Sequence, residues 1–363
     1  MSQPPLSGQP AKILTTFSGL VPPGSASESR LFDADRVDWN VDWQTALRRA
    51  IRSTNQLRQL LGLPLESDSR DSNEFGTFVP LEFLRRIQKG DARDPLLRQV
   101  LVTSDEQLQH SGFVSDPVGD GDALATPGLI HKYDGRVLLI ASGACAVHCR
   151  YCFRREFPYG EFGGQRQKWE AAIQYVRSHP DVHEVILSGG DPLTLVDENL
   201  FELLDRIDAI GHVRRIRIHS RFPIVIPQRI TPAFCDHLSS LRSRVWFVIH
   251  ANHASELDAT CLSRIGLLVE AGIPVLNQSV LLRGVNANEQ SLVDLMTRLV
   301  DHRIQPYYLH QLDRVRGTKH FEVPIQHGLE LMRRIRARLP GYAVPTYVTE
   351  QPGQPSKTPL DRI

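Results

Sequence analysis

The sequence lacks three features that would place it in a broad class of protein. It has no excess of charge, because 42 Lys and Arg residues face 41 Asp and Glu residues. Bulk charge therefore gives no indication of nucleic-acid binding, and we expect no nucleic-acid partner. It has no apolar run long enough to cross a bilayer, since the stretch at 137–147 is too short and contains Ser142 and Gly143. The first residues lack a basic segment followed by an apolar core, so we expect no signal peptide, no membrane association and a cytoplasmic location.

Cysteine and lysine are both scarce. There are five cysteines, an odd number, and Cys145, Cys149 and Cys152 fall within one short segment. A clustered, odd set does not resemble the disulfide framework of a secreted protein. Only six of the 42 basic residues are lysines, so each lysine is a comparatively rare amine in this chain.

Apolar periodicity divides the chain into four parts. Residues 1–28 are rich in Pro, Ser and Gly, and we expect a flexible tail there. Residues 29–118 carry apolar side chains at helical spacing and predict an N-terminal helical region. Residues 119–325 alternate short apolar runs with helical segments. Residues 326–363 form a C-terminal segment with a predicted helix at 326–339, a short strand at 344–349 and a loop-like end.

The alternating part predicts an α/β fold with a parallel sheet. We expect strands at 136–141, 184–187, 214–219, 245–250, 274–280 and 305–310. We expect helices between them at 165–179, 197–210, 232–241, 255–271 and 289–302. Six units are too few for a closed eight-stranded barrel. We therefore favour an open, partial (βα)6 barrel, although periodicity alone does not separate it from a flat doubly wound sheet.

The cysteine motif lies directly after the first strand of this array. It reads Cys145-Ala-Val-His-Cys149-Arg-Tyr-Cys152, at the carboxyl end of a strand, where parallel α/β enzymes place their chemistry. Three thiolates on one loop can bind three irons of a cubane cluster and leave the fourth iron open. The alternatives are structural cysteines, or a zinc site for which His148 would be the convenient fourth ligand.

A glycine-rich turn follows the second strand of the array. Its residues are Ser188, Gly189, Gly190 and Asp191, followed by a proline. Glycine lets a backbone approach a ligand closely. The same residues also suit an ordinary turn before a helix.

The motifs together resemble the radical S-adenosylmethionine (SAM) superfamily. In that superfamily the open iron of a [4Fe–4S] cluster binds SAM, and the glycine-rich loop faces the methionyl amine. Over about residues 119–361 the chain more closely resembles the lysine 2,3-aminomutase family, which also uses pyridoxal 5′-phosphate (PLP). The resemblance is carried by RVLLIASGACAVHCRYCFRR, SGGDPL, SRFPIVIPQRIT, LNQSVLLRGVN, QPYYLHQLD and PSKTPLD.

The resemblance implies roles for three residues around PLP. Lys357, in the loop QPGQPSKTP, would bind the cofactor covalently. Arg136 would contact its phosphate, and Gln278 would lie near its ring. Taken alone, these residues are equally a solvated tail lysine, a surface arginine and a polar strand residue. Four further polar residues near strand ends are candidates for the SAM pocket: Arg217, Ser220, His250 and His253.

The same resemblance implies a lysine substrate. Arg154 would pair with the substrate carboxylate, and Asp313 and Glu350 would pair with its ε-ammonium, since a buried ammonium needs acidic partners. The family pattern leads us to expect Asp at this position. Glu350 keeps the negative charge, but its side chain is longer than that of Asp by one methylene. Solvated loop acids are the alternative, and arginine or glutamate are the rival substrates.

The end of the chain suggests a branch of the family. Longer members continue into a segment whose cysteines bind structural zinc, whereas here no cysteine follows Cys261. We therefore expect no zinc, and a homodimer with a different interface. The chain resembles the short branch that makes β-lysine for elongation factor P, often called EpmB. Flavodoxin or ferredoxin is the expected electron donor. The competing functions are a radical SAM enzyme of another class, without PLP, and a non-enzymatic metal-binding protein.

Overall fold

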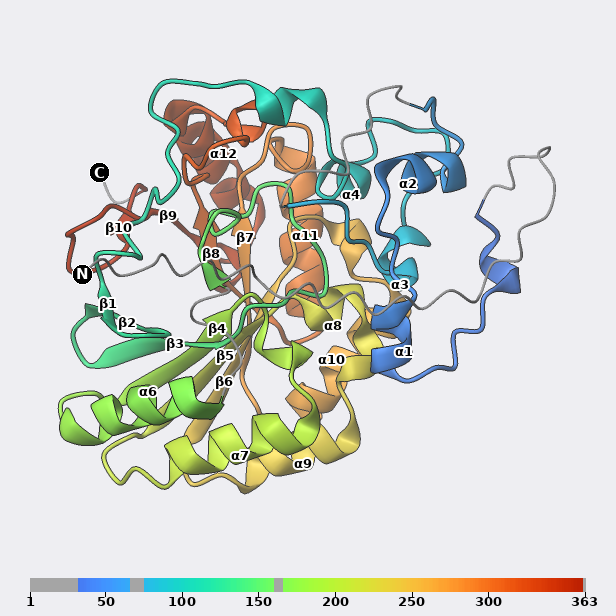
Figure 1. Cartoon of the computed structure of the whole chain (residues 1–363). Coiled ribbons are helices and arrows are strands. Elements are labelled where there is room, and N and C mark those ends of the chain that lie inside the picture. The colour runs from blue at the N-terminus through green and yellow to red at the C-terminus, as the bar shows by residue number, and fades with distance from the viewer. Residues whose placement is uncertain (1–31, 66–74, 160–165, 362–363) are drawn as a thin grey trace, which may run out of the picture.

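A computed structural model describes residues 32–65, 75–159 and 166–361 of the chain. The expected flexible tail at 1–28 and the first residue of the helix expected at 165–179 lie outside these ranges. Figure 1 shows a curved sheet with helices along its outer side. In the described ranges, no helix combines the length and apolarity needed to cross a bilayer.

In the described part of the chain, ten strands form one sheet in the order of the sequence. They are β1 (Leu124–Thr126), β2 (Leu129–Tyr133), β3 (Arg136–Ser142), β4 (Glu184–Gly189), β5 (Arg215–Ser220), β6 (Arg244–His250), β7 (Val275–Val280), β8 (Gln305–His310), β9 (Thr346–Thr349) and β10 (Thr358–Pro359). Strands β3 to β9 run parallel, and they include the six predicted strands. The antiparallel additions β1, β2 and β10 were not predicted. The sheet is therefore mixed.

Apart from α8 (Phe222–Val225), which was not predicted, the helices of the barrel match the predicted ones with small shifts at the ends. They are α6 (Arg166–Ser178), α7 (Asp197–Asp208), α9 (Pro232–Ser240), α10 (Ala259–Glu270), α11 (Glu289–Asp301) and α12 (Ile325–Arg338). Side-chain caps set several starts. Thr231 accepts from the Phe234 N–H ahead of α9, and Asn288 accepts from the Ser291 N–H ahead of α11. The expected helix at 255–271 begins later, because Asp258 caps α10.

The N-terminal helices are short and pack against the barrel. They are α1 (Trp43–Arg48), α2 (Thr54–Leu60), α3 (Leu81–Leu84) and α4 (Pro95–Arg98). Trp43 meets Phe222 edge to face with ring centroids 5.6 Å apart. Arg85 forms an ion pair with Asp258 at 2.9 Å. The N-terminal helices and the barrel thus share a hydrophobic core.

Side chains alternate along the strands between the hydrophobic core under the helices and the cavity inside the barrel. On β4, Val185 and Leu187 are fully buried, whereas Glu184, Ile186 and Ser188 line a cavity. On β5, alternate residues beginning with Arg215 line the same cavity. Successive side chains of a strand point to opposite faces, so one face of the sheet packs against the helices and the other surrounds the cavity.

An ion pair joins the two ends of the sheet. Lys132 lies on β2 and Glu350 directly follows β9, yet Lys132 Nζ lies 3.0 Å from Glu350 Oε1. A flat doubly wound sheet would hold these two strands at opposite edges. The sheet is therefore curled, and the partial (βα)6 barrel with an N-terminal helical region is the correct fold.

Candidate active site

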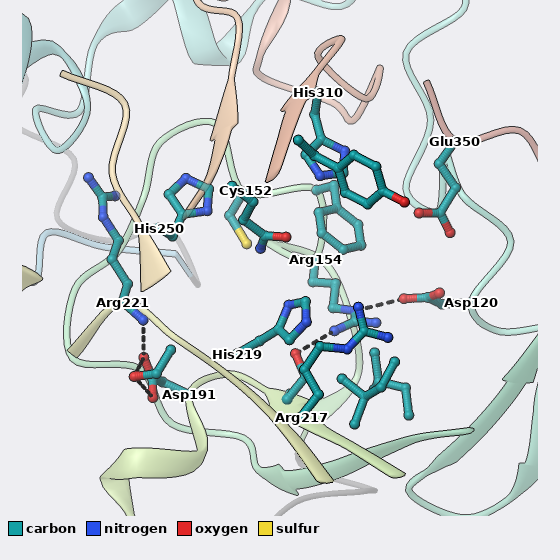
Figure 2. Close-up of a pocket in the computed structure, with 18 of the residues that line it drawn as sticks. Asp120, Cys152, Arg154, Asp191, Arg217, His219, Arg221, His250, His310 and Glu350 are labelled. Carbon is teal, nitrogen blue, oxygen red and sulfur yellow. Dashed lines mark hydrogen bonds and ion pairs between the residues drawn. The ribbon is translucent and has the colours of Figure 1, made fainter. Parts of the chain in front are cut away.

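The interior of the barrel contains a cavity of about 660 Å³. Figure 2 shows charged and aromatic side chains pointing into it from several strands. It is lined by all of the residues predicted for the site: Arg136, Cys145, Cys149, Cys152, Arg154, Ser188, Gly189, Gly190, Asp191, Gln278, Asp313, Glu350 and Lys357. Three of the four SAM-pocket candidates, Arg217, Ser220 and His250, also line it. His253 does not, because its ring caps a short 3-10 turn.

The N-terminal region fixes the cysteine loop after β3. The backbone N–H of His148 donates to the Phe78 carbonyl at 3.1 Å, and that of Arg150 donates to the Gln99 carbonyl at 2.9 Å. The His148 ring stacks on Phe75, with its Nδ1 2.8 Å from the Gly76 carbonyl. His148 is thus engaged outside the cavity, which argues against its serving as a fourth zinc ligand.

The donor set on this loop fits a cluster better than a single ion. Burial and the neighbouring thiols raise the pKa of Cys145 well above its ordinary value, and burial raises the pKa of Cys152 to about 11. Iron binding would supply the charge that keeps such thiols ionised. His148 is engaged outside the cavity, and three thiols without a fourth protein ligand fit a cubane whose fourth iron is open.

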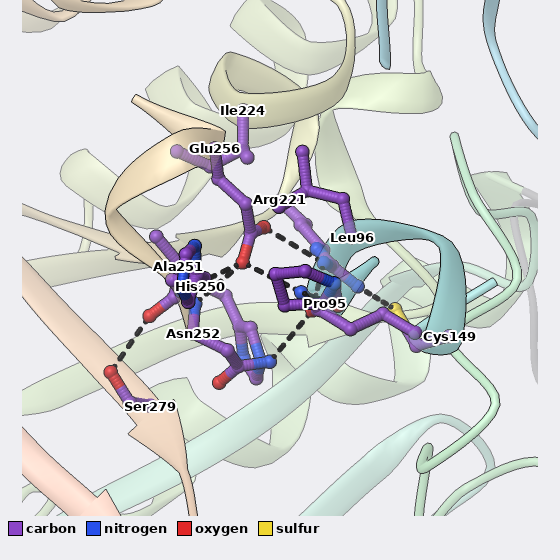
Figure 3. A network of polar contacts seen from close by, with 12 residues as sticks. Pro95, Leu96, Cys149, Arg221, Ile224, His250, Ala251, Asn252, Glu256 and Ser279 are labelled. Atoms are coloured by element: carbon purple, nitrogen blue, oxygen red, sulfur yellow. Dashed lines mark hydrogen bonds and ion pairs between the residues drawn. The ribbon is translucent and has the colours of Figure 1, made fainter. Parts of the chain in front are cut away.

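A buried polar network reaches Cys149 at one of its edges (Figure 3). The guanidinium of Arg221 lies 2.7 Å from Cys149 Sγ and pairs with Glu256 at 2.9 Å. Gln99 accepts from the same guanidinium at 2.7 Å and donates to Glu256 at 3.0 Å. Burial alone would raise the pKa of Glu256, but Arg221 outweighs that effect and holds it below its ordinary value. The network places a fixed positive charge beside one expected cluster ligand.

The glycine-rich turn packs directly on the cysteine loop. Gly189 has φ +121°, and a Cβ there would lie 2.4 Å from the Ser142 carbonyl oxygen. A Cβ on Gly190 would lie 2.3 Å from the Ala144 carbonyl oxygen. Both glycines are thus required by contact between the two loops. Asp191 is buried and accepts from Ser220 Oγ at 2.8 Å and from the Arg221 N–H at 2.8 Å. Contact of this turn with SAM stays a prediction.

The amino-terminal end of the barrel is cationic. Arg136, Arg215 and Arg217 line the cavity there, together with the single acid Glu184. Glu184 pairs with Arg217 at 2.6 Å and with Arg215 at 3.3 Å. The Nε of Arg217 is buried without a hydrogen-bond partner in the described structure. An arginine surplus with an unsatisfied buried donor fits the phosphate of PLP, and Lys357 lines the same cavity.

Arg154 is held by an aspartate that the sequence did not reveal. Its Nε donates to Asp120 Oδ2 at 2.7 Å, and its Nη1 lies 3.4 Å from Ser188 Oγ (Figure 2). Burial alone would raise the pKa of Asp120, but Arg154 and Lys132 together hold it below its ordinary value. A guanidinium fixed through Nε keeps its other nitrogens for a carboxylate.

The two predicted ammonium-binding acids have different surroundings. Glu350 pairs with Lys357 and with Lys132. These cations outweigh its burial and lower its pKa to about 2. Burial raises the pKa of Asp313 to about 7, although Lys357 acts against the rise. No described residue hydrogen-bonds the Asp313 carboxylate. Glu350 is therefore paired with lysines of the chain. Asp313 is a carboxylate in the cavity wall that no described residue hydrogen-bonds.

Three histidines in the cavity are neutral. Burial, reinforced by Arg221, lowers the pKa of His250 to about 3. Burial, reinforced by Lys357, lowers the pKa of His310 to about 3. The pKa of His219 is also well below its ordinary value, first because of burial and then because of Arg217. These rings add polar surface without adding charge.

Sequence reasoning missed Asp120, Lys132 and Arg221. Asp120 and Lys132 lie before the first predicted strand, in a hairpin region where no element was expected. Arg221 follows a predicted strand within the quoted run SRFPIVIPQRIT, and that position was its only signal.

Comparison with known proteins agrees with this geometry. Residues 134–221 match the family described as "4Fe-4S single cluster domain". The chain is 44% identical to "L-lysine 2,3-aminomutase" of Escherichia coli (strain K12) over 324 residues, which cover 88% of this chain and 94% of that protein. It is 35% identical to the protein of the same name from Clostridium subterminale, over 90% of this chain and 79% of that protein. The chain belongs to the L-lysine 2,3-aminomutase family.

Membership of this family confirms several expectations. Lysine 2,3-aminomutases are isomerases, so the chain is an enzyme of that class. The expected cofactors, a [4Fe–4S] cluster, SAM and PLP, agree with the matched cluster domain and with the family. The radical SAM class is likewise supported. The alternative of a non-enzymatic metal-binding protein is wrong.

Proposed function

We propose that this aminomutase converts α-lysine to β-lysine. The observation that carries the choice of lysine is Asp313, a cavity-lining carboxylate that no described residue hydrogen-bonds. A carboxylate in the cavity wall that no described residue hydrogen-bonds favours a substrate that brings a donor to it. A glutamate substrate would instead bring a second carboxylate to two acids. Lysine supplies both the carboxylate for Arg154 and the ammonium for the acids.

The residues divide the cavity among the three cofactors and the substrate. Cys145, Cys149 and Cys152 would hold the cluster, with the turn at 188–191 facing SAM. Lys357, Arg136 and Gln278 would hold PLP. When bound, the cluster and SAM supply the radical and PLP carries the migrating amine. The chain itself binds both ends of the substrate, keeps the reacting carbons in place and excludes water.

Electrostatics support this division. The guanidinium of Arg154 has one nitrogen committed to Asp120 and others that can face a carboxylate. The neutral rings of His219, His250 and His310 carry no positive charge that would compete with the substrate ammonium for the acids. Ion pairing between partly buried groups in a cavity is stronger than in water. The substrate would thus be fixed at both ends, which leaves its α- and β-carbons in a defined position.

We further propose the setting in which the enzyme works. The β-lysine would serve to modify elongation factor P, a proposal that rests on the resemblance of the chain to the short branch of the family. Flavodoxin or ferredoxin would reduce the cluster, since these carriers deliver single electrons at low potential. Clustered free thiols support a cytoplasmic location. A homodimer remains a proposal from the family resemblance.

A product assay tests the substrate assignment. Reconstituted enzyme is incubated anaerobically with reductant and SAM, and with α-lysine, arginine or glutamate in separate reactions. We expect β-lysine as the main product, with far slower turnover of the other two. Equal or faster turnover of arginine or glutamate would defeat the assignment. For the acceptor, transfer of the β-lysine product to purified elongation factor P by its ligase should exceed transfer of α-lysine.

A further inference from the structure

Five alternating charges run along one wall of the cavity. Asp120 lies between Arg154 and Lys132, with contacts of 2.7 Å and 2.5 Å. Lys132 in turn contacts Glu350 at 3.0 Å, and Glu350 contacts Lys357. The chain of contacts therefore connects Arg154, expected at the carboxylate of the substrate, to Glu350, expected at its ammonium.

Lys132 is fixed in place by three acceptors. Its Nζ contacts Asp120 Oδ1, Glu350 Oε1 and the Val118 carbonyl oxygen, the last at 2.8 Å. An ammonium has three N–H donors, so all of them are used. Its side chain is only 15% exposed. Burial would lower the pKa of Lys132, but Asp120 and Glu350 outweigh that effect and hold it above its ordinary value. Lys132 is a permanent cation of the site.

Glu350 has two oxygens with different partners. Oε1 faces Lys132, and Oε2 faces Lys357. Once the Lys357 amine is committed to PLP, Oε2 is the oxygen that can receive another ammonium. Glu350 and Asp313 would then present two carboxylates to one substrate ammonium. Two carboxylates close to a single cation repel each other, which favours protonation of one of them. A second cation beside them reduces this repulsion and favours the ionised form of both.

We propose that Lys132 is a positioning residue that sets selectivity for the substrate side chain. It holds Glu350 through Oε1 and adds a second positive charge beside the two acids, which favours their ionised forms around the substrate ammonium. Asp120 acts on the other end, because it orients Arg154 toward the carboxylate that every amino acid carries. The proposal rests on the assignment of lysine as substrate, and it adds a residue that does not itself contact lysine.

A ligand that lacks the ε-ammonium distinguishes effects on binding of the substrate carboxylate from effects on binding of the substrate ammonium. Norleucine has the carboxylate, the α-amine and the same side-chain carbons as lysine, but no ε-ammonium. Lys132→Met should raise KM for lysine roughly 10- to 100-fold, the effect of losing a hydrogen bond to a charged group. It should leave kcat and the inhibition constant of norleucine within about threefold. Asp120→Asn should weaken lysine and norleucine alike.

Three controls test whether Lys132 positions Glu350 for the substrate or only holds the two ends of the sheet together. Lys132→Arg keeps the charge and can bridge two carboxylates, so it should restore KM to within about fivefold. Lys319→Met removes a lysine that pairs with Glu322 away from the cavity, and it should leave KM unchanged. In a double-mutant cycle, Lys132→Met and Glu350→Gln should be strongly non-additive in KM for lysine.

The proposal would be overturned by any of three results. Lys132→Met and Lys132→Arg could lose melting temperature and bound PLP equally, which would make Lys132 a structural link only. Lys132→Met could weaken norleucine as much as lysine. The double-mutant cycle could be additive. Failure of the wild-type enzyme to form β-lysine would instead refute the proposed function, and the wild-type reaction is run first for that reason.

Discussion

The guanidinium of Arg221 contacts the sulfur of Cys149, with Nη1 2.7 Å from Sγ, and pairs with Glu256 on its other side. A positive charge beside a ligand sulfur favours the more reduced, more negative state of a cluster. Replacing Arg221 by Gln would also leave Glu256 buried and unpaired, at a cost of about 3–5 kcal/mol. We therefore choose the double variant Arg221→Gln, Glu256→Gln. It should retain iron and show a more negative midpoint potential in an EPR redox titration. An unchanged potential at full iron content would show that the contact does not tune the cluster.

The three loop cysteines should differ from the other two in iron binding. Cys149→Ala removes a ligand, so it should lose most of the iron and sulfide and all SAM cleavage. Cys235 is buried in α9, away from the cavity. Cys235→Ala is the matched control and should keep wild-type iron content, with a stability loss of about 1 kcal/mol. Iron and sulfide analysis after anaerobic reconstitution checks both variants. Full iron in Cys149→Ala would contradict the assignment.

Lys357 should carry PLP. Borohydride reduction of the holoenzyme followed by peptide mass spectrometry should find the phosphopyridoxyl group on Lys357. Lys357→Ala should lose this modification and keep its iron, because the cysteine loop lies on a different element. Modification of another lysine in the wild-type enzyme would sink the assignment.

Much of this site was predictable, and the reasons are local. The six parallel strands follow from apolar runs such as 184–187, whose alternate residues pack against the helices. The cysteine loop is indicated by its spacing and by its place after the first strand, whereas the PLP role expected of Lys357 came from the family resemblance. Apart from His253, the residues predicted for the site line one cavity, because they lie on the inward-facing side of the strands or on the loops that follow them.

The site residues that we did not predict from the sequence depend on contacts between segments that are distant in the chain. Asp120 is 34 positions from Arg154, and Lys132 is 218 positions from Glu350. Neither pair belongs to a motif, since an ion pair across a curled sheet has no fixed spacing. The β1–β2 hairpin is short and only partly buried, so its alternation was weak. His253 failed as a pocket residue because a strand-end position does not fix which way the side chain points.

Affinity for lysine should depend on pH through Asp313. Burial raises the pKa of its carboxyl to about 7, and only the ionised form attracts the substrate ammonium. KM for lysine should therefore fall as pH rises through about 7, and then level off. Lys357, Glu350, Lys132 and Asp120 are the charged groups whose fields act on Asp313. Asp313→Asn should raise KM and remove this dependence. The transition should fall between about pH 6 and 8, within one unit of this pKa. A KM for lysine that rises with pH over that range would contradict the role given to Asp313.

The proposed reaction moves the α-amine of lysine to the adjacent carbon. The most direct measurement uses α-lysine labelled with nitrogen-15 at the α-amine, incubated anaerobically with the reconstituted, reduced enzyme and SAM. We expect β-lysine that retains the label on its β-amine, with no exchange with unlabelled ammonium in the buffer. β-Lysine that has lost the label, or no β-lysine from an enzyme with full cluster and PLP content, would contradict the proposed reaction.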